Sequence, residues 1–292
     1  MPEGDTVFRQ CAVLHAALAG ARLTRGELRV PRHGAVDLGG WEVLEVRPRG
    51  KHVLIRMRGP APERRLLTLH SHLVMDGTWR VRSDGRLRSP RDEGRADARG
   101  KAPHTARIIL EGVRPDGRAV SASGLDVQQV RLVPTGRESE LVGHLGPDLL
   151  DPDWRPEHTA RAAANLEEAG RRALGIALLD QRIMAGIGNV YRAELLYRAL
   201  LDPHTPGKLV PEEVVRGIWR DWVRLLRIGV ETGQMMTMDG LSADEYRAAM
   251  ASRDDRHWVY HRAGLPCRVC GTEIALEEIG ARKLYWCPRC QR

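Results

Sequence analysis

The first part of the chain carries hydrophobic residues at helical spacing. These residues lie three or four positions apart and are Val7, Cys11, Leu14 and Leu18. The spacing predicts a helix that begins after Glu3 and ends at Gly20, where glycine is a natural stop. Because Cys11 belongs to this apolar stripe, we expect it to be a buried and unreactive thiol.

The region from about residue 23 to residue 130 consists of short segments that are bounded by turns. One segment alternates apolar and polar residues and the others are short apolar runs; they cover residues 53–58, 66–69, 78–81 and 108–110. This pattern predicts strands that form an all-β sandwich or barrel. Residues 82–104 are polar and rich in Arg, Asp and Gly, which predicts a long flexible loop.

Beyond Pro134 the apolar residues return to helical spacing. The segments that show it are residues 174–184, 190–200 and 211–228. Pro211 suits the first turn of the last of these helices. Three prolines place the interdomain hinge close to residues 146–156. Near the end of the chain, aromatic and β-branched residues predict short strands at 258–260 and 285–286.

The composition suits a folded protein with a polyanionic partner. The chain has 292 residues, of which 42% are hydrophobic, enough for two domains with their own cores. Lysine and arginine number 46 against 38 acidic residues. Basic proteins bind nucleic acid by neutralising phosphates, although charge alone does not establish such a partner. Without an apolar stretch of membrane-spanning length or a signal pattern, we expect a cytosolic protein whose cysteines bind metal or stay free.

Four cysteines near the end of the chain form two pairs with the spacing C-x2-C-x16-C-x2-C. They are Cys267, Cys270, Cys287 and Cys290. Two tight turns that each present two thiolates make a tetrahedral zinc site. Four protein ligands leave no position for water, so we expect one structural Zn²⁺ rather than a catalytic ion. Arg282 and Lys283 lie near the far end of the predicted hairpin, either as two solvated charges or as a phosphate-binding group.

The chain begins Met1-Pro2-Glu3-Gly4. Removal of Met1 leaves Pro2 with a secondary amine that, when neutral, can attack a sugar C1′ and give an iminium. The positive end of the following helix favours the neutral amine. The adjacent Glu3 carboxyl is placed to donate or shuttle a proton. The alternative is an ordinary chain start in which an acidic residue opens a helix.

Three motifs occur together along the chain. They are the opening tetrapeptide, the run Gly-Ile-Gly-Asn-Val-Tyr-Arg-Ala-Glu over residues 186–194, and Cys-Pro-Arg-Cys-Gln over residues 287–291. Together they resemble the formamidopyrimidine-DNA glycosylase/endonuclease VIII family, and the match covers essentially the whole chain. The resemblance implies an α+β multidomain fold, with an N-terminal β-sandwich flanked by helices, a helical domain with a helix–two-turn–helix, and a zinc-finger hairpin.

The resemblance also implies how the chain is divided and where DNA binds. The expected parts are the catalytic β-sandwich domain at 1–134, a hinge at 135–155, the helical domain at 156–250 and the zinc finger at 256–292. DNA is expected in the cleft between the two halves.

The resemblance assigns roles to individual residues. Pro2 matches the family's Schiff-base nucleophile, and Glu3 matches its catalytic acid. Lys51, in the segment Arg-Gly-Lys-His, matches a catalytic lysine that enters a strand and contacts the backbone flanking the lesion. Asn189 matches the phosphate-binding asparagine of the helix–two-turn–helix. Arg282 matches the zinc-finger arginine that grips the backbone at the flipped nucleotide.

The chemistry of the residues is compatible with this assignment. Gly186 and Gly188 permit a tight turn, and Asn189 then opens a helix whose N–H groups can meet a phosphate, although an ordinary helix–helix turn has the same pattern. A flipped base leaves a hole in the duplex. Residues 72–77 resemble the family's void-filling loop, with Met75 as the candidate wedge because a flexible apolar side chain replaces lost stacking; a core methionine is the alternative.

Two branches of the family differ in the lesions they remove. The purine branch, which acts on lesions such as 8-oxoguanine, usually carries a Gly-Gly-Thr-Thr-like segment followed by Arg-Asp-Phe. Residues 229–236 read Gly-Val-Glu-Thr-Gly-Gln-Met-Met instead, while residues 121–126 and 282–287 look more like endonuclease VIII. We therefore expect mainly oxidised pyrimidines as substrates. Thr6, where glutamate is common in the family, and the charged segment 82–104 leave the lesion and opposite-base preferences open.

The implied activity is that of a bifunctional DNA glycosylase and AP lyase of base excision repair, with β,δ-elimination and no redox cofactor. The expected partner is double-stranded DNA with damaged bases or abasic sites, bound by a monomer at the nucleoid. The alternatives are a purine-directed formamidopyrimidine/8-oxoguanine glycosylase, an AP lyase without useful glycosylase activity, and a non-catalytic zinc protein that binds DNA with the same fold.

Overall fold

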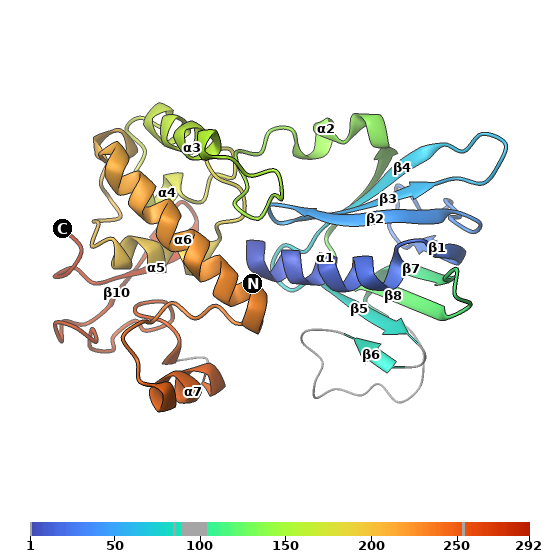
Figure 1. The fold of residues 1–292 in the computed structure, drawn as a ribbon. Coiled ribbons are helices and arrows are strands. Elements are labelled where there is room, and N and C mark those ends of the chain that lie inside the picture. The colour runs from blue at the N-terminus through green and yellow to red at the C-terminus, as the bar shows by residue number, and fades with distance from the viewer. Residues whose placement is uncertain (1, 84–85, 89–103, 253–254) are drawn as a thin grey trace. The chain divides into compact units, whose positions relative to one another are not determined.

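The computed structural model describes residues 2–83, 86–88, 104–252 and 255–292. The chain forms two compact units, residues 1–144 and 145–292, which are described one at a time (Figure 1). Within the described ranges, no helix combines the length and the apolar character needed to cross a membrane.

The first unit begins with helix α1, Gly4–Leu18, as the sequence predicts. Its N-terminal flanking residue is Glu3, whose extended backbone precedes the first turn. The predicted apolar stripe is buried, and Cys11 on that stripe is 1% exposed. Burial raises the pKa of the Cys11 thiol, so this cysteine is the unreactive group that its position predicts.

The strands of the first unit form a sheet whose neighbours are all antiparallel, in the order β6-β5-β8-β7-β1-β2-β3-β4-β9. Their bounds are β1 Arg22–Leu28, β2 Glu42–Arg49, β3 His52–Arg58, β4 Leu66–His72, β5 Thr78–Ser83, β6 Arg86–Arg88, β7 Ala106–Val113, β8 Ala119–Leu125 and β9 Gln129–Pro134. A short 3-10 helix, Thr135–Arg137, and helix α2, Ser139–Val142, end the unit.

The sheet divides into the two layers of a sandwich between β1 and β2. These strands share a single register pair, Arg22 with Glu42, whereas β1 pairs with β7 along its length. Helix α1 contacts β2 and β3 of one layer and β5 and β8 of the other (Figure 1). The predicted sandwich is confirmed. The predicted loop at 82–104 is wrong at its start, because β5 continues to Ser83 and pairs with β6; residues 84–85 and 89–103 lie outside the described residues.

Helix α1 is fastened to the sheet by hydrogen bonds as well as by apolar packing. The Gln10 amide donates to Thr78 Oγ1 over 3.2 Å and accepts the backbone N–H of Trp79 over 3.3 Å. The Trp79 indole, 1% exposed, donates to Ser71 Oγ in β4. The Gln10 bonds thus fix α1 to β5, and the Trp79 bond joins β5 to β4 of the other layer.

The second unit is mainly helical. Its helices are α3 Pro156–Glu168, α4 Leu174–Ala177, α5 Asn189–Arg198, a 3-10 helix at Gly207–Leu209, α6 Glu212–Thr232 and α7 Ala243–Ala251. The predicted helices at 190–200 and 211–228 are confirmed as α5 and α6. The helices α3 and α7 were not predicted, although the capping box from Ser242 to Glu245 is a sequence signal for the start of α7.

The predicted helix at 174–184 is wrong beyond Ala177, where α4 ends and turns follow. Side chains in this segment accept hydrogen bonds from backbone N–H groups that would otherwise bond within a helix. Asp180 Oδ1 accepts the N–H of Arg182, and Gln181 Oε1 accepts the N–H of Gly186. The apolar residues at helical spacing are nevertheless buried. In this segment the periodicity therefore indicates which residues are buried, but it does not indicate a helix.

The last part of the second unit is a two-stranded hairpin, β10 Ala275–Ile279 and β11 Arg282–Trp286. Its two-residue turn, Gly280-Ala281, has positive φ at both positions, which matches the twist of the flanking strands. The predicted strand at 285–286 is confirmed within β11. The predicted strand at 258–260 is wrong, because these residues form bends and a turn.

Candidate active site and DNA contacts

The candidate nucleophile and acid lie side by side in sequence directly before α1. Pro2 is buried, and Glu3 is 0% exposed. The helix begins at Gly4, so its positive end adjoins these two residues. Removal of Met1 would give Pro2 a secondary amine directly before this buried carboxyl, as the predicted roles of the two residues require. Met1 lies outside the described residues.

Lys51 occupies a two-residue turn with Gly50 between β2 and β3. The register pair Arg49–His52 closes this turn, and Gly50 has φ 56°, a left-handed conformation that favours glycine. Side chains of β3 and β4 meet beside it, because His52 pairs with His72 in the register of the two strands. Lys51 is therefore held at a rigid hairpin end and not on a long loop.

A cluster of four imidazoles surrounds the start of β3. His52 stacks on His70 at 5.0 Å between ring centres, meets His72 edge-on at 4.7 Å and lies 6.5 Å from His144. His52 Nδ1 and His70 Nε2 are 2.7 Å apart, so one ring donates a hydrogen bond to the other. This bond requires that the accepting ring carries no proton on the bonded nitrogen, so the two rings cannot both be doubly protonated.

Burial keeps three of these imidazoles, those of His52, His70 and His72, neutral. It lowers the pKa of His52 to about 2, with smaller effects from the neighbouring rings and Lys51. Burial, followed by the charge of Lys51, lowers the pKa of His72 to about 4. Burial, followed by His72 and Arg131, lowers the pKa of His70 to about 4. With these rings neutral, the positive charges that act on them are those of Lys51 and Arg131.

The candidate wedge, Met75, lies in the turn between β4 and β5 and is 40% exposed. Val74, directly before it, has φ 54°, which is uncommon for a β-branched residue. His72 Nδ1 accepts the N–H of Val74 over 3.0 Å, and Gly77 N–H bonds to Leu73 O over 3.0 Å. A Cβ at Gly77 would lie 2.6 Å from Leu73 O, so this position requires glycine. The exposure favours a wedge over a core methionine.

Asn189 is the first residue of α5, as predicted, and follows the turn in which Gly186 has φ 109°. Its side chain is turned towards the zinc-finger hairpin: Nδ2 donates to Lys283 O over 2.8 Å. Its Oδ1 accepts from the guanidinium of Arg192, one turn later on α5. Asn189 and the strand that begins with Arg282 are thus brought together within this unit.

Arg282 is the first residue of β11 and is exposed, next to the Gly280-Ala281 turn. The neighbouring Leu284 is 0% exposed and anchors the strand. The hairpin therefore presents the guanidinium from a rigid element, which is the arrangement that the sequence predicts for a phosphate contact.

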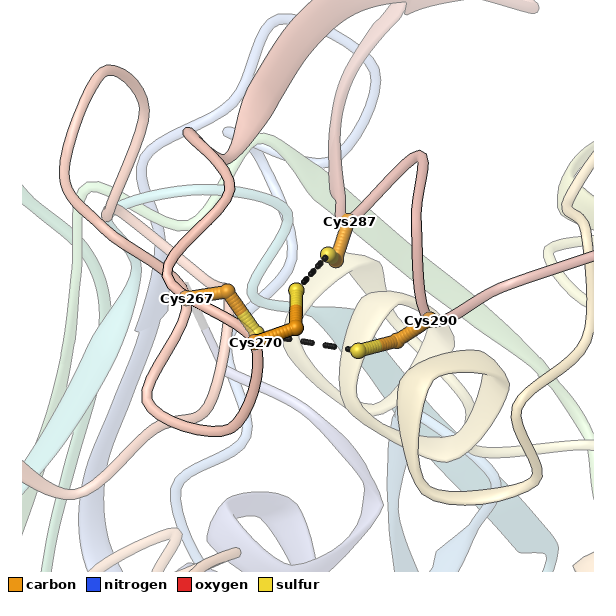
Figure 2. Close-up of side chains that lie close together, drawn as sticks. All are labelled: Cys267, Cys270, Cys287 and Cys290. Carbon is orange, nitrogen blue, oxygen red and sulfur yellow. Dashed lines mark hydrogen bonds between the residues drawn. The ribbon is translucent and has the colours of Figure 1, made fainter.

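The four predicted zinc ligands converge at the base of the hairpin (Figure 2). All four sulfur atoms lie within 4.8 Å of one another. Cys270 and Cys287 are 3.5 Å apart, and Cys267 and Cys290 are 3.9 Å apart. Sulfur atoms about 2.3 Å from a tetrahedral zinc are about 3.8 Å from each other. The cluster therefore fits zinc, and four thiolates would hold it as a structural ion.

Two side chains join this cluster to the helices of the same unit. The Tyr197 hydroxyl of α5 lies 3.2 Å from Cys267 Sγ. Gln291 accepts the N–H of Cys287 over 2.9 Å and donates to Leu201 O over 2.9 Å. Groups that bond to metal ligands orient them, so these contacts extend the zinc site into the helical domain.

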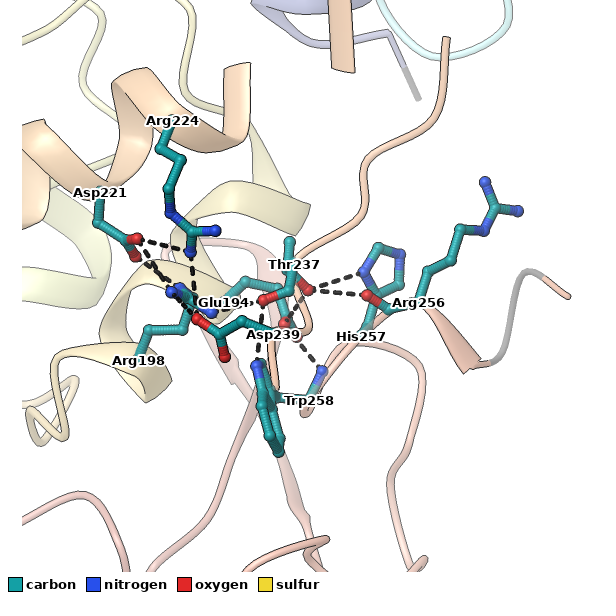
Figure 3. Close-up of polar contacts among 9 residues, drawn as sticks. All are labelled: Glu194, Arg198, Asp221, Arg224, Thr237, Asp239, Arg256, His257 and Trp258. Atoms are coloured by element: carbon teal, nitrogen blue, oxygen red, sulfur yellow. Dashed lines mark hydrogen bonds and ion pairs between the residues drawn. The ribbon is translucent and has the colours of Figure 1, made fainter. Parts of the chain in front are cut away.

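A buried carboxylate, Glu194 of α5, holds the segment that leads to the first cysteine pair (Figure 3). It is 0% exposed and accepts the N–H groups of Trp258, Val259 and Tyr260 over 2.8–2.9 Å. It also accepts the Thr237 hydroxyl. Three converging main-chain donors explain why residues 258–260 are not a strand, since N–H groups in a strand point alternately to opposite sides.

An ion-pair network lies beside this carboxylate (Figure 3). Arg198 of α5 pairs with Asp221 of α6 and with Asp239, and it donates to Thr237 O over 2.6 Å. Arg224 pairs with the same two aspartates. The network fastens α5, α6 and the segment after α6 to one another.

The sequence reasoning missed the histidine cluster, Arg192, Glu194 and Tyr197. The histidine pair had a local signal, because His70 and His72 are two residues apart on a strand and share a face. The other three belong to helix α5 and act on residues about 65 to 90 positions later, at Trp258, Cys267 and Lys283. Contacts at such separation leave no trace in a local pattern.

Comparison with known families assigns three parts of the chain. Residues 1–120 match the formamidopyrimidine-DNA glycosylase N-terminal domain, and residues 145–239 match the formamidopyrimidine-DNA glycosylase H2TH domain. Residues 264–292 match a zinc finger found in FPG and IleRS. The last match includes all four converging cysteines.

Relatives of known name extend over the full chain. A probable endonuclease 8 2 of Streptomyces coelicolor is 41% identical over 100% of this chain and 94% of its own length. A DNA-(apurinic or apyrimidinic site) lyase Nei2 of Mycolicibacterium smegmatis is 42% identical over 100% and 99%. An endonuclease 8 2 of Mycobacterium tuberculosis is 42% identical over 100% of both chains.

Solved structures share the fold. The MutM (Fpg) protein of Thermus thermophilus is 28% identical, with a TM-score of 0.71 over 99% of this chain and 98% of its own. The Lactococcus lactis Fpg in complex with abasic-site DNA has a TM-score of 0.73 at 20% identity over 99% of each chain. Full-length relatives above 40% identity, three matching domains and the shared fold together show that the chain belongs to the formamidopyrimidine-DNA glycosylase/endonuclease VIII family.

Proposed function

We propose that the chain is a bifunctional DNA glycosylase and AP lyase of base excision repair, which acts as a monomer on double-stranded DNA. It removes oxidised bases, mainly pyrimidines, and cleaves the backbone at the abasic site that results. With DNA as its substrate, the proposed place of action is the nucleoid in the cytoplasm.

The observation that carries the proposal is the pair Pro2 and Glu3 at the start of α1, in a chain related over its full length to endonuclease 8 and AP lyase proteins. The three domain matches supply the context in which a buried N-terminal pair of this kind has a catalytic role.

In the first step, the neutral Pro2 nitrogen attacks C1′ of the damaged nucleotide and forms an N–C bond as the C1′–base bond breaks. The electron pair of the broken bond leaves with the base. The nitrogen then loses its N–H proton, which passes to the departing base. Glu3 protonates the sugar ring oxygen, and the nitrogen lone pair forms the C1′=N bond as the C1′–O bond breaks, so the ring opens and an iminium remains between Pro2 and C1′.

In the second step, the iminium acidifies the C2′ proton. Its removal expels the 3′ phosphate by β-elimination, and loss of a further proton expels the 5′ phosphate by δ-elimination. Hydrolysis of the iminium then releases the sugar fragment and restores the amine. Every step is a proton transfer, a substitution, an elimination or a hydrolysis, so the electrons balance without an oxidant or a reductant.

The remaining groups hold the DNA. Lys51 provides a positive charge for the backbone next to the lesion, and Met75 fills the space that the flipped base leaves. The second N–H of the Asn189 amide and the Arg282 guanidinium bind phosphates. Zinc, held by the four cysteines, would fix the hairpin that carries Arg282 and takes no part in the chemistry.

Oxidised pyrimidines are favoured over purines by the sequence relatives. Endonuclease 8 proteins match at up to 42% identity, whereas the Thermus thermophilus MutM structure matches at 28%. Residues 229–236 also lack the Gly-Gly-Thr-Thr-like segment of the purine branch.

Borohydride trapping on an abasic duplex tests the proposal. The native chain should give a covalent adduct, which should disappear with Pro2→Thr. Glu3→Gln should still form an adduct at a preformed abasic site, where no base has to leave, but should lose excision of 5-hydroxyuracil. Trapping that survives Pro2→Thr would contradict the role of Pro2, and intact mass that includes Met1 would contradict it as well.

A second candidate is an AP lyase with little glycosylase activity, which the name of the Mycolicibacterium smegmatis relative favours. Duplexes that carry 5-hydroxyuracil, thymine glycol, 8-oxoguanine or an abasic site separate the two candidates. Cleavage of the abasic duplex alone would support the lyase.

A further inference from the structure

Arg192 lies on α5 three residues after Asn189 and is 0% exposed. Its guanidinium donates to three oxygen atoms that belong to three different segments. These are Gly175 O at 3.0 Å, Lys283 O at 2.9 Å and Asn189 Oδ1 at 2.5 Å. A planar fork with fixed donor directions is the side chain that can hold three such acceptors at once.

The three acceptors connect the two groups that are expected to bind phosphate in this unit. Lys283 O also accepts the Asn189 amide N–H at 2.8 Å, so both lone pairs of this carbonyl are engaged by α5. Lys283 follows Arg282 directly in β11. The position of the Arg282 backbone is therefore fixed relative to Asn189 by two hydrogen bonds to its neighbour.

We propose that Arg192 is a positioning residue that makes Asn189 and the Arg282 strand one rigid phosphate clamp. The inference rests on the proposed function, which supplies the roles of Asn189 and Arg282. Arg192 itself is buried and does not touch DNA; it acts through the two groups that do. Its bond to Asn189 Oδ1 also sets the orientation of the amide, so that the Nδ2 side faces Lys283 O and the phosphate.

The substitution Arg192→Lys separates the effect of the planar guanidinium geometry from the effect of the positive charge. A lysine keeps one positive charge on a flexible stem but loses the fork, so it can serve one of the three acceptors at a time. Arg192→Met removes charge and fork together. Arg198→Met is the matched control, because Arg198 is also largely buried on α5 and also donates to a backbone carbonyl, but it contacts neither Asn189 nor β11.

The salt dependence of binding is a readout that loss of stability alone would not move. The logarithm of the binding constant falls with the logarithm of salt concentration by about 0.9 for each phosphate that a cation neutralises. Equilibrium binding to a duplex with a non-cleavable tetrahydrofuran site is measured at several salt concentrations. Arg282→Ala should reduce the slope by about 0.9.

Arg192→Lys should weaken binding about tenfold and should reduce the slope by about as much as Arg282→Ala does. The charge of the protein is unchanged in this variant, so the reduced slope would mean that Arg282 no longer reaches its phosphate. In the Arg282→Ala background, Arg192→Lys should leave the slope as it is and weaken binding by less than in the parent. Arg198→Met should leave the slope unchanged. Zinc content and thermal unfolding of each variant identify any that fail to fold.

An unchanged slope in folded Arg192→Lys, or full additivity with Arg282→Ala, would overturn the inference. Arg282→Ala and Asn189→Ala test the proposed function separately: if neither weakens binding to the tetrahydrofuran duplex, the phosphate roles themselves fail. If both weaken binding and Arg192→Lys does not, the positioning role alone is wrong.

Discussion

His72 Nδ1 lies 3.0 Å from the backbone nitrogen of Val74, two residues further along the chain. An imidazole that accepts the N–H of residue i+2 takes the place of the Asn or Asp oxygen that commonly closes such turns. The bond supports Val74 at φ 54° and so sets the direction of Met75. The acceptor requires a ring without a proton on Nδ1, and the lowered pKa of His72, about 4 through burial and the charge of Lys51, maintains that state.

We predict that His72→Phe weakens the insertion of Met75, because the ring is kept but the acceptor is lost. A neutral hydrogen bond contributes about 1 kcal/mol, so insertion should fall by about five- to tenfold. The measurement is the fluorescence of 2-aminopurine next to a tetrahydrofuran site. His72→Asn, which restores an acceptor, should recover most of the signal.

His15→Phe is the control, because His15 Nδ1 also accepts a backbone N–H, that of Val46, outside the Met75 turn. It should not change the fluorescence. Equal losses in His72→Phe and His72→Asn would show that the acceptor does not support the wedge.

The buried His70 should make the stability of the chain depend on pH. Its folded pKa of about 4 lies below the unfolded value of 6.5, through burial and then the charges of His72 and Arg131. The unfolded chain therefore binds more protons between these values, and stability should fall as pH decreases from about 6.5, by up to about 1.4 kcal/mol per pH unit. Thermal unfolding at a series of pH values should show a shallower decline for His70→Gln. An identical decline would exclude His70 as a source.

Tyr197→Phe should weaken zinc retention without disturbing the helix that carries it. The hydroxyl is 3.2 Å from Cys267 Sγ. Removal of a group that bonds to a metal ligand typically lowers metal affinity by about 10- to 100-fold, and we expect a loss of zinc affinity in that range. Zinc transfer to a chromophoric chelator measures the change. Tyr246→Phe on α7 is the matched control and should behave as the parent does.

Glu194→Gln should loosen residues 258–260. The carboxylate accepts three main-chain N–H groups, and an amide in its place would turn an NH₂ group towards some of them. Leaving buried donors unsatisfied costs about 1–3 kcal/mol. Hydrogen exchange of the amides of Trp258, Val259 and Tyr260 should accelerate accordingly. Glu213→Gln, on the exposed start of α6, should not alter their exchange.

The parts of the fold that could be predicted are those with a strong local period or a fixed ligand spacing. Helix α1 and the long helix α6 have one apolar face, and the zinc cluster is encoded by two short cysteine pairs. The same reasoning failed for residues 174–184, because the Asp180 and Gln181 side chains accept backbone N–H groups and the segment forms turns beyond α4. It also failed for residues 258–260, because their conformation depends on hydrogen bonds to the Glu194 carboxylate, about 65 positions earlier in the chain.

The candidate site divides in the same way. The cysteines follow from their spacing. The chemistry of Pro2 and Glu3 made them candidates but left an ordinary chain start open, so their roles, like those of Lys51, Asn189 and Arg282, required the family resemblance. The groups that support them, such as the His52–His70 pair and Arg192, depend on strand register and on helix packing against β11. These relationships exist only after folding and could not be read from the chain.

Glu194 bonds to the main-chain amides of residues 258–260. This contact therefore depends on how many residues the stretch contains and not on which side chains they carry. Single-residue insertions or deletions here would shift the first cysteine pair out of register with its metal. Chain-length variation among distant homologues should therefore accumulate around α7, upstream of His257, and the tripeptide would serve as a fixed reference point for aligning them.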